Sequence, residues 1–319
     1  MLRCQQYLSW DPKFQMNDIE KLAEELFSKG INVNQYLRDN HPELGEDAII
    51  RLSYDTQAGS YSKEMVEKNE MYQAYGNAIV QRLSPYFKTI NSILDAGCGE
   101  LTGSYQLIEA ARDLRYVGID GSFSRLLAGK KFLSNQGVCT PPDLDLLASS
   151  LTYIPLSSSS IDLVFTSHAI EPNSLNSARI IQELARVSNR YIALFEPCYE
   201  DATEEMKAHM DKHNYARGIR ECCEKNGLEL IDIDNDLPCI EPLLNKTTFM
   251  LYSKPGSRAS ARSSVHKYIT PDNYRYQLEE LETATLMCRE TDTMYPSLHG
   301  IRLLNSNNAM KLSGCSALV

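Results

Sequence analysis

Three short motifs carry residues whose types and spacing could bind a nucleotide-like ligand. In the first, LDAGCGE, an apolar run ends in Asp95, and Gly97 and Gly99 form a turn before a helix. Such a turn brings backbone N–H groups and a helix N-terminus close to a ligand. The spacing differs from the G-x-G-x-x-G pattern of dinucleotide sites. A carboxylate at Asp95 would repel a pyrophosphate but can accept hydrogen bonds from an ammonium group.

The second motif is RYVGIDGS, an apolar segment that ends in Asp120 and Gly121. An acid at the end of the second strand of a nucleotide-binding sheet can accept both hydroxyls of a ribose. The alternative is that Asp120 or Ser122 only caps the next helix. Taken with the first motif, the ribose interpretation is favoured.

The third motif is the segment 149–173, a polar loop containing Pro155 followed by the strand IDLVFTS. This loop follows the third expected strand, where the edge of an adenine would lie. Ser150 and Leu151 could meet that edge through backbone groups.

Alternating apolar and helical segments between residues 90 and 253 would position these motifs. Short apolar strands separated by helical crossovers imply a parallel sheet with helices on both faces. The expected strands are 92–96, 115–119, 143–148, 161–167, 189–195, 228–234 and 247–253. A long polar helix is expected at 201–226.

Two further parts flank this sheet, so we expect an N-terminal helical cap over 1–88, a sheet domain over 89–255, and a linker with a small C-terminal extension over 256–319. In the cap, the segment 52–65 contains Tyr54 and Tyr61. It is either an ordinary loop or a lid whose tyrosines close over a cationic or adenosine-like ligand.

Residues 90–253 resemble class I S-adenosylmethionine-dependent methyltransferases. LDAGCGE is similar to that family's first motif and GIDGS to its second, and the Pro155 loop with IDLVFTSHAIE resembles its D-A-x-x-L-P loop and F-D-x-V strand. The resemblance covers about half of the chain. It implies an α/β, Rossmann-like, seven-stranded and mostly parallel sheet with an antiparallel last strand, and S-adenosyl-L-methionine as the cofactor over the C-terminal strand ends.

The resemblance also implies which residues hold the cofactor. Asp95 and the glycine turn would bind its amino-acid end, Asp120 its ribose, and Tyr61 would approach the methionine carboxylate. The usual acid of the adenine loop is Ser150 here, so adenine would be recognised without a carboxylate. The expected cofactor contacts are Tyr61, Asp95, Gly97, Gly99, Asp120, Gly121, Ser150, Leu151 and Ser167.

Methyl transfer to oxygen requires alignment of the acceptor and a group that takes its proton. Candidate bases follow the fourth and fifth strands, namely His168 and Glu196. The expected substrate-binding residues are Glu171, Asn173, Tyr199, His213 and Tyr215. We expect O-methylation of a small polar acceptor such as a sugar or sugar acid. N- or C-methylation and a non-catalytic nucleotide-binding module are alternatives, and a dehydrogenase is disfavoured by Asp95 and the glycine spacing.

Two weaker patterns remain. His209 and His213 have the i, i+4 spacing of metal ligands, but no third ligand is evident, so a polar helix face is favoured and no metal is expected. The segment DTMYPSLHGIRLLN resembles the Y-P-x-x-x-G-I-P-x-L-L end of small zinc-ribbon-like companions of methyltransferases, without their cysteine pairs. A hairpin packed on the main domain is an equal alternative, after a helix at about 274–290.

Composition excludes several classes of function. The net charge of −10 and the pI of about 5.2 argue against nucleic acid as a partner. There is no apolar run of membrane-spanning length and no signal-peptide core. The nine cysteines form no C-x-x-C pair. We therefore expect a cytoplasmic protein with reduced thiols and a small-molecule acceptor, and nothing in the sequence indicates its oligomeric state.

Overall fold

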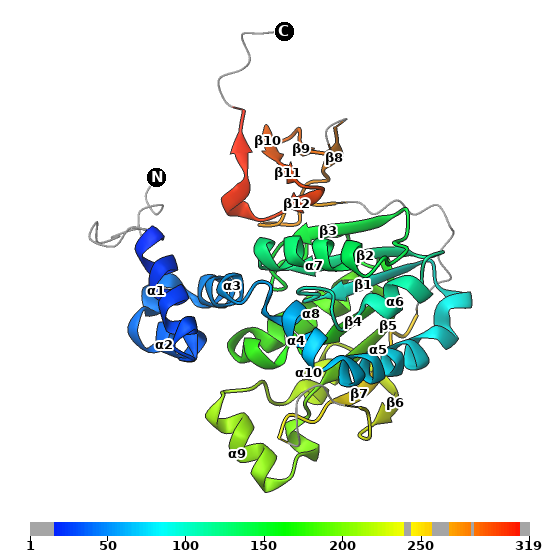
Figure 1. Cartoon of the computed structure of the whole chain (residues 1–319). Helices are drawn as coiled ribbons and strands as arrows, with labels where there is room; N and C mark the ends of the chain where they lie inside the picture. Colours follow the sequence, from blue (N-terminus) through cyan, green and yellow to red (C-terminus); the bar gives the residue numbers. More distant parts are fainter. Residues whose placement is uncertain (1–15, 239–243, 257–267, 282–283, 313–319) are drawn as a thin grey trace.

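The computed structural model describes residues 16–238, 244–256, 268–281 and 284–312. A large sheet crosses the middle of the molecule, with helices on both faces, and the N-terminal helices lie to one side (Figure 1). The described strands of this sheet run in the order β11-β12-β3-β2-β1-β4-β5-β7-β6. Their bounds are β1 Ser92–Ala96, β2 Arg115–Asp120, β3 Leu144–Ala148, β4 Ile161–Ser167, β5 Ser188–Glu196, β6 Glu229–Asp234, β7 Thr248–Ser253, β11 Ser297–Leu298 and β12 Ile301–Leu303.

The predicted α/β fold is confirmed, and the sheet is wider than expected. All seven predicted strands are present, and β7 pairs antiparallel with β5 as the resemblance implied. Two additional strands, β11 and β12, come from the C-terminal extension and join the sheet beside β3. Because β1 to β5 run parallel, their carboxyl ends meet at one edge, and this edge carries the three motifs.

Alternate residues of the central strands face the two helical layers. Ile93 belongs to the core that includes α5 and α6, whereas its neighbour Leu94 belongs to the core that includes α8 and α10. The sheet is therefore buried on both faces, which is why its strands are continuous apolar runs. The bounds of the helices that cover it are α5 Asn69–Leu83, α6 Tyr105–Ala110, α7 Phe123–Asn135, α8 Ser177–Val187 and α10 Ile219–Lys225.

The N-terminal helices form a lid with a small core of its own. The lid comprises α1 Met16–Ser28, α2 Val33–Asn40, α3 Glu46–Thr56 and α4 Ser60–Glu67. Its core contains Ile19, Leu37 and Leu52, separate from the cores of the sheet. The segment 52–65, expected as loop or lid, is mostly helical, because α3 continues to Thr56 and α4 starts at Ser60.

Two helix predictions are wrong. The expected helix at 201–226 is divided into α9 Glu204–Lys212 and α10, because Asn214 and Gly218 adopt left-handed backbone conformations between them. The expected helix at 274–290 is instead part of a small antiparallel sheet, ordered β13-β10-β9-β8. Its strands are β8 Glu279–Glu280, β9 Leu286–Cys288, β10 Thr293–Tyr295 and β13 Met310–Lys311. Leu286 and Cys288 are buried, with Met287 between them less so, which is the period of a strand.

Short 3₁₀ helices complete the described secondary structure, at η1 Pro42–Leu44, η2 Ser84–Thr89, η3 Glu171–Asn176, η4 Tyr199–Asp201 and η5 Ser306–Asn308. The expected hairpin near 294–305 is present as β11 and β12. The Ser/Arg-rich segment 257–264, which forms the start of the expected linker, lies outside the described residues. Within the described part of the chain, no helix is long and apolar enough to cross a membrane.

Candidate cofactor and acceptor site

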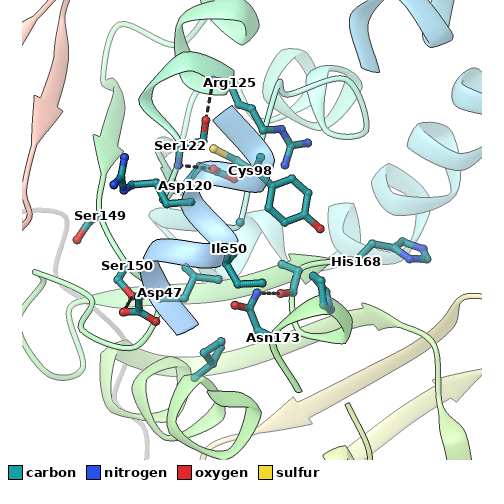
Figure 2. Close-up of a pocket in the computed structure, with 18 of the residues that line it drawn as sticks. Asp47, Ile50, Cys98, Asp120, Ser122, Arg125, Ser149, Ser150, His168 and Asn173 are labelled. Carbon is teal, nitrogen blue, oxygen red and sulfur yellow. Dashed lines mark hydrogen bonds between the residues drawn. The ribbon is translucent and has the colours of Figure 1, made fainter. Parts of the chain in front are cut away.

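A cavity of about 830 Å³ lies at the carboxyl ends of β1 to β4, between the sheet and the lid. Figure 2 shows that its wall combines residues of the lid helix α3 with residues of the strand-end loops. Most of the residues predicted to hold a cofactor line it, namely Tyr61, Asp95, Gly97, Asp120, Gly121, Ser150, Leu151 and Ser167. This volume is typical of a pocket for a small molecule or cofactor.

The glycine turn is held against the end of β2. The N–H groups of Gly97 and Cys98 both donate to the carbonyl oxygen of Ile119, at 2.7 and 3.0 Å. Gly97 has a φ of +85°, and a Cβ there would collide with that of Ala169. Only glycine suits both the conformation and the close approach.

Asp95 lies in the cavity wall directly before this turn, where Tyr116 donates a hydrogen bond to its Oδ2 at 3.0 Å. Burial raises the pKa of Asp95 to about 7, against hydrogen bonds from Ser104 and Tyr116 that lower it. An adjacent cation would reverse that shift, so the site favours a positively charged group at this position.

Asp120 stands at the end of β2 with both carboxylate oxygens engaged. Oδ2 accepts from the N–H of Gly99 at 2.9 Å, and Oδ1 accepts from the N–H of Ser122 at 2.8 Å. The side chain that caps α7 is that of Ser122, which accepts from the N–H of Arg125. A carboxylate has about four acceptor positions, so Asp120 keeps capacity for hydroxyl groups in the cavity.

Glu100 and Arg125, which the sequence analysis did not single out, connect the lid to the segment around the glycine turn. Glu100, almost completely buried, accepts from the N–H groups of Gly59 and Ser62 at 2.8 and 2.9 Å. The Arg125 guanidinium lies 4.9 Å from the ring centre of Tyr54 and 4.5 Å from that of Tyr61. Both tyrosines line the cavity, which agrees with the lid interpretation. The sequence contains a signal for each residue: Glu100 is an acid directly after GCG, and Arg125 lies on the first helical turn after GIDGS.

The acceptor end of the cavity contains His168, Glu171 and Asn173, all three of which were predicted. His168 Nδ1 lies 2.9 Å from Glu171 Oε2, and Nε2 lies 2.6 Å from Thr247 Oγ1. The backbone of His168 is left-handed, with a φ of +52°, which is uncommon for a residue with a side chain. Such a conformation persists only when its surroundings hold it.

Glu196 provides part of that support and lies outside the cavity wall. It is fully buried, and its carboxylate accepts from the N–H groups of Ala169 and Ile170 at 3.0 and 3.2 Å. It thereby fixes the turn that follows His168. The catalytic role expected for Glu196 therefore has no support from its position, whereas a positioning role does.

The raised pKa of Glu196 makes the free energy of unfolding depend on pH. Burial, aided by the negative charge of Glu171, raises this pKa from 4.5 to about 7. The folded state then holds a proton that the unfolded state releases, so this group lowers the free energy of unfolding as the pH rises from 4.5 to 7. A shift of this size corresponds to about 3 kcal/mol.

We expect the difference in unfolding free energy between wild type and Glu196→Gln to fall by about this amount between pH 4.5 and 7.5, because the variant has no proton to lose. Urea unfolding of both proteins at a series of pH values measures the difference. Parallel curves would contradict the raised pKa.

The remaining predicted substrate residues, Tyr199, His213 and Tyr215, are not among the residues that line this cavity. The ring of His213 lies tilted against that of His209 beside the end of α9, with ring centres 4.4 Å apart. Among the described residues, no three His, Cys, Asp or Glu side chains are grouped so that they could hold a metal ion.

Comparison with known proteins agrees with this geometry. Residues 94–190 match the family described as "Methyltransferase domain". This part of the chain is therefore a methyltransferase domain, in agreement with the resemblance of its motifs to the class I S-adenosylmethionine-dependent family. The family match and the motifs of the sequence imply S-adenosylmethionine as the cofactor, which would supply an electrophilic methyl group bound to a sulfonium sulfur.

Several solved structures match at low sequence identity, and no curated protein matches. Magnesium protoporphyrin IX methyltransferase from Synechocystis is 16% identical, with 60% of this chain and 86% of that chain covered and a TM-score of 0.46. A matching chain in a complex of a methyltransferase activator and a putative methyltransferase from Haloferax volcanii is 15% identical, with 63% of this chain and 97% of that chain covered and a TM-score of 0.46. Geranyl diphosphate C-methyltransferase from Streptomyces coelicolor is 10% identical, with 56% of this chain and 79% of that chain covered and a TM-score of 0.45.

The residues of the methyltransferase cavity fit this cofactor. The turn at Gly97 lies in the cavity wall, Asp120 offers acceptors for a ribose, and Asp95 offers one for an ammonium group. Leu151 supplies apolar surface in the loop after β3. The donor and acceptor types thus match those of a cationic adenosine derivative.

Proposed function

We propose that the methyltransferase transfers the methyl group to a hydroxyl of a small polar acceptor, with His168 as the general base. The observation that carries this proposal is the position of His168 in the cavity wall, between Glu171 and Thr247. Glu171 can only accept a hydrogen bond when ionised, so the neutral imidazole carries its proton on Nδ1. Nε2 then carries the lone pair that can accept a hydrogen bond or a proton.

That arrangement suits proton removal from a hydroxyl. With that tautomer the Thr247 hydroxyl, which is buried outside the cavity wall, donates to Nε2, so an acceptor hydroxyl must displace this hydrogen bond to reach the lone pair. The Glu171 carboxylate would stabilise the imidazolium that forms. General base catalysis of this kind typically contributes 10²- to 10⁴-fold to a rate.

The lining of the cavity favours a hydroxyl-rich acceptor. Glu64 and Glu171 contribute carboxylates, and Tyr72, Tyr75 and Asn173 contribute hydroxyl and amide groups. Tyr72 donates to Glu64 at 3.2 Å, so these groups already form polar pairs. Carboxylates and amide oxygens accept hydrogen bonds from hydroxyls, which agrees with an acceptor of the sugar or sugar-acid type.

The test compares His168→Asn with wild type on a panel of sugars and other polyols, with release of S-adenosylhomocysteine as the readout. We expect turnover to fall about 100-fold with unchanged affinity for S-adenosylhomocysteine, because the proton acceptor is lost while the cofactor contacts remain. The matched control is His213→Asn, at a histidine outside the cavity wall, which should retain wild-type turnover.

Three outcomes would contradict the proposal. Full turnover by His168→Asn would exclude His168 as the base. A product with its new methyl group on nitrogen or carbon, identified by NMR, would exclude O-methylation and leave the cofactor assignment intact. Failure of wild type to bind S-adenosylhomocysteine would favour a non-catalytic module.

A further inference from the structure

The adenine end of the cavity lacks an acid on the loop after β3 but receives one from the lid. Asp47, in the first turn of α3, reaches across to this loop. Its Oδ2 accepts from Ser150 Oγ at 2.9 Å and from Thr152 Oγ1 at 3.0 Å, and its Oδ1 accepts from Asn176 Nδ2 at 3.0 Å. Figure 2 shows Asp47 directly beside Ser150, below Ser149.

The charge of Asp47 is held by neutral donors alone. No Lys or Arg in the described part of the chain forms an ion pair with it. Three hydrogen bonds leave about one acceptor position of the carboxylate free. Asp47 is exposed to the open cavity, so this position is accessible to a ligand.

The surroundings suit a flat heterocycle. Ile50, one turn further along α3, and Leu151, from the loop after β3, both line the cavity and provide apolar surface. Ser150 accepts from the N–H of Thr152 at 3.1 Å while its hydroxyl donates to Asp47. The polar groups at this end are thus arranged around a single carboxylate.

We propose that Asp47 recognises the exocyclic amino group of the adenine, as a carboxylate supplied by the lid in place of the acid that Ser150 replaces. This proposal rests on S-adenosylmethionine being the cofactor. An ionised carboxylate accepts from an amino group and repels a carbonyl oxygen, so Asp47 discriminates adenine from hypoxanthine. The bound adenine would then join the lid to the loop after β3, and cofactor binding would hold the lid closed.

The experiment measures binding rather than turnover. Isothermal titration gives the affinities of wild type, Asp47→Asn and Asp55→Asn for S-adenosylhomocysteine and for its inosine analogue, in which a carbonyl replaces the amino group. We expect wild type to prefer the amino compound at least 10-fold. Asp47→Asn should bind S-adenosylhomocysteine about 10-fold more weakly than wild type does. It should also lose the preference for this compound over the inosine analogue, because the amide of asparagine can donate to the carbonyl of the analogue.

Asp55→Asn is the matched control. Asp55 lies on the same helix and accepts from Ser122 Oγ at 2.5 Å, so it also joins the lid to a cofactor motif, but it does not line the cavity. Its replacement should weaken both ligands equally and leave the preference unchanged. Thermal unfolding of the unliganded proteins shows whether each variant is folded.

A wild-type preference in Asp47→Asn would overturn the assignment. Should that variant fail to fold, Ser150→Ala, which removes a donor that orients the carboxylate, must reduce the same preference for the proposal to stand. Wild type that binds neither compound would instead overturn the cofactor assignment.

Discussion

Replacement of Asp120 with alanine is expected to weaken binding of S-adenosylhomocysteine about 1,000-fold. Two hydrogen bonds from ribose hydroxyls to a carboxylate contribute about 2 kcal/mol each, and each 1.4 kcal/mol is a factor of ten. The carboxylate also accepts from the N–H groups of Gly99 and Ser122, so its loss leaves two donors beside the glycine turn without their acceptor. Isothermal titration measures the affinity.

A suitable control is Asp162→Ala, at another buried carboxylate. Asp162 accepts from the N–H of Asn91 at 2.7 Å and from Asn189 Nδ2 at 2.9 Å, at the opposite end of the sheet from the cavity. This variant should lose thermal stability and keep its affinity. If Asp120→Ala binds within about threefold of wild type, the ribose contact is not made by this residue.

Replacement of Ile301 with aspartate is expected to destroy the cooperative fold. Ile301 is fully buried, and β12 pairs parallel with β3 through Ile301–Leu146, Arg302–Leu147 and Leu303–Ala148. An unpaired charge at such a site costs about 4 kcal/mol or more, against a total stability of about 5–15 kcal/mol. Loss of β12 would also expose the edge of β3, and an exposed sheet edge favours aggregation.

Urea unfolding and the soluble fraction after expression measure this effect. The control is Leu298→Asp, in the neighbouring strand β11, where the side chain is 50% exposed. That change should alter the unfolding free energy by about 0.5 kcal/mol or less. A soluble Ile301→Asp protein of wild-type stability would show that the extension is dispensable for the sheet.

The C-terminal extension is therefore part of the methyltransferase sheet and also reaches the cavity. Arg302 donates to Asp145 of β3 at 3.0 Å, and the N–H of Leu304 donates to the carbonyl of Ala148. Immediately after β12, Asn305, Ser306 and Asn307 line the cavity. The strand that covers β3 thus also leads directly into polar residues of the cavity wall.

The sequence by itself determined the motifs and their order. Gly97 and Asp120 could be assigned because a glycine turn and a strand-terminal acid depend on residues close in the chain. The seven strands were predictable for the same reason, since each is an apolar run between turn residues. His168 and Glu171 could be placed together because three positions separate them.

Only the tertiary structure decided which distant groups meet. Asp47 lies 103 residues from Ser150, and no local pattern predicts that pair. Pairing of β12 with β3 is likewise non-local. From sequence, the segment 294–305 was therefore predicted only as a hairpin, or as similar to the end of the small zinc-ribbon-like companions of methyltransferases. Glu196 looked catalytic at a strand end, but packing buried it beneath the turn of His168. Local sequence specifies turns and strands, whereas the closure of a lid and the partner of an edge strand depend on contacts between segments far apart in the chain.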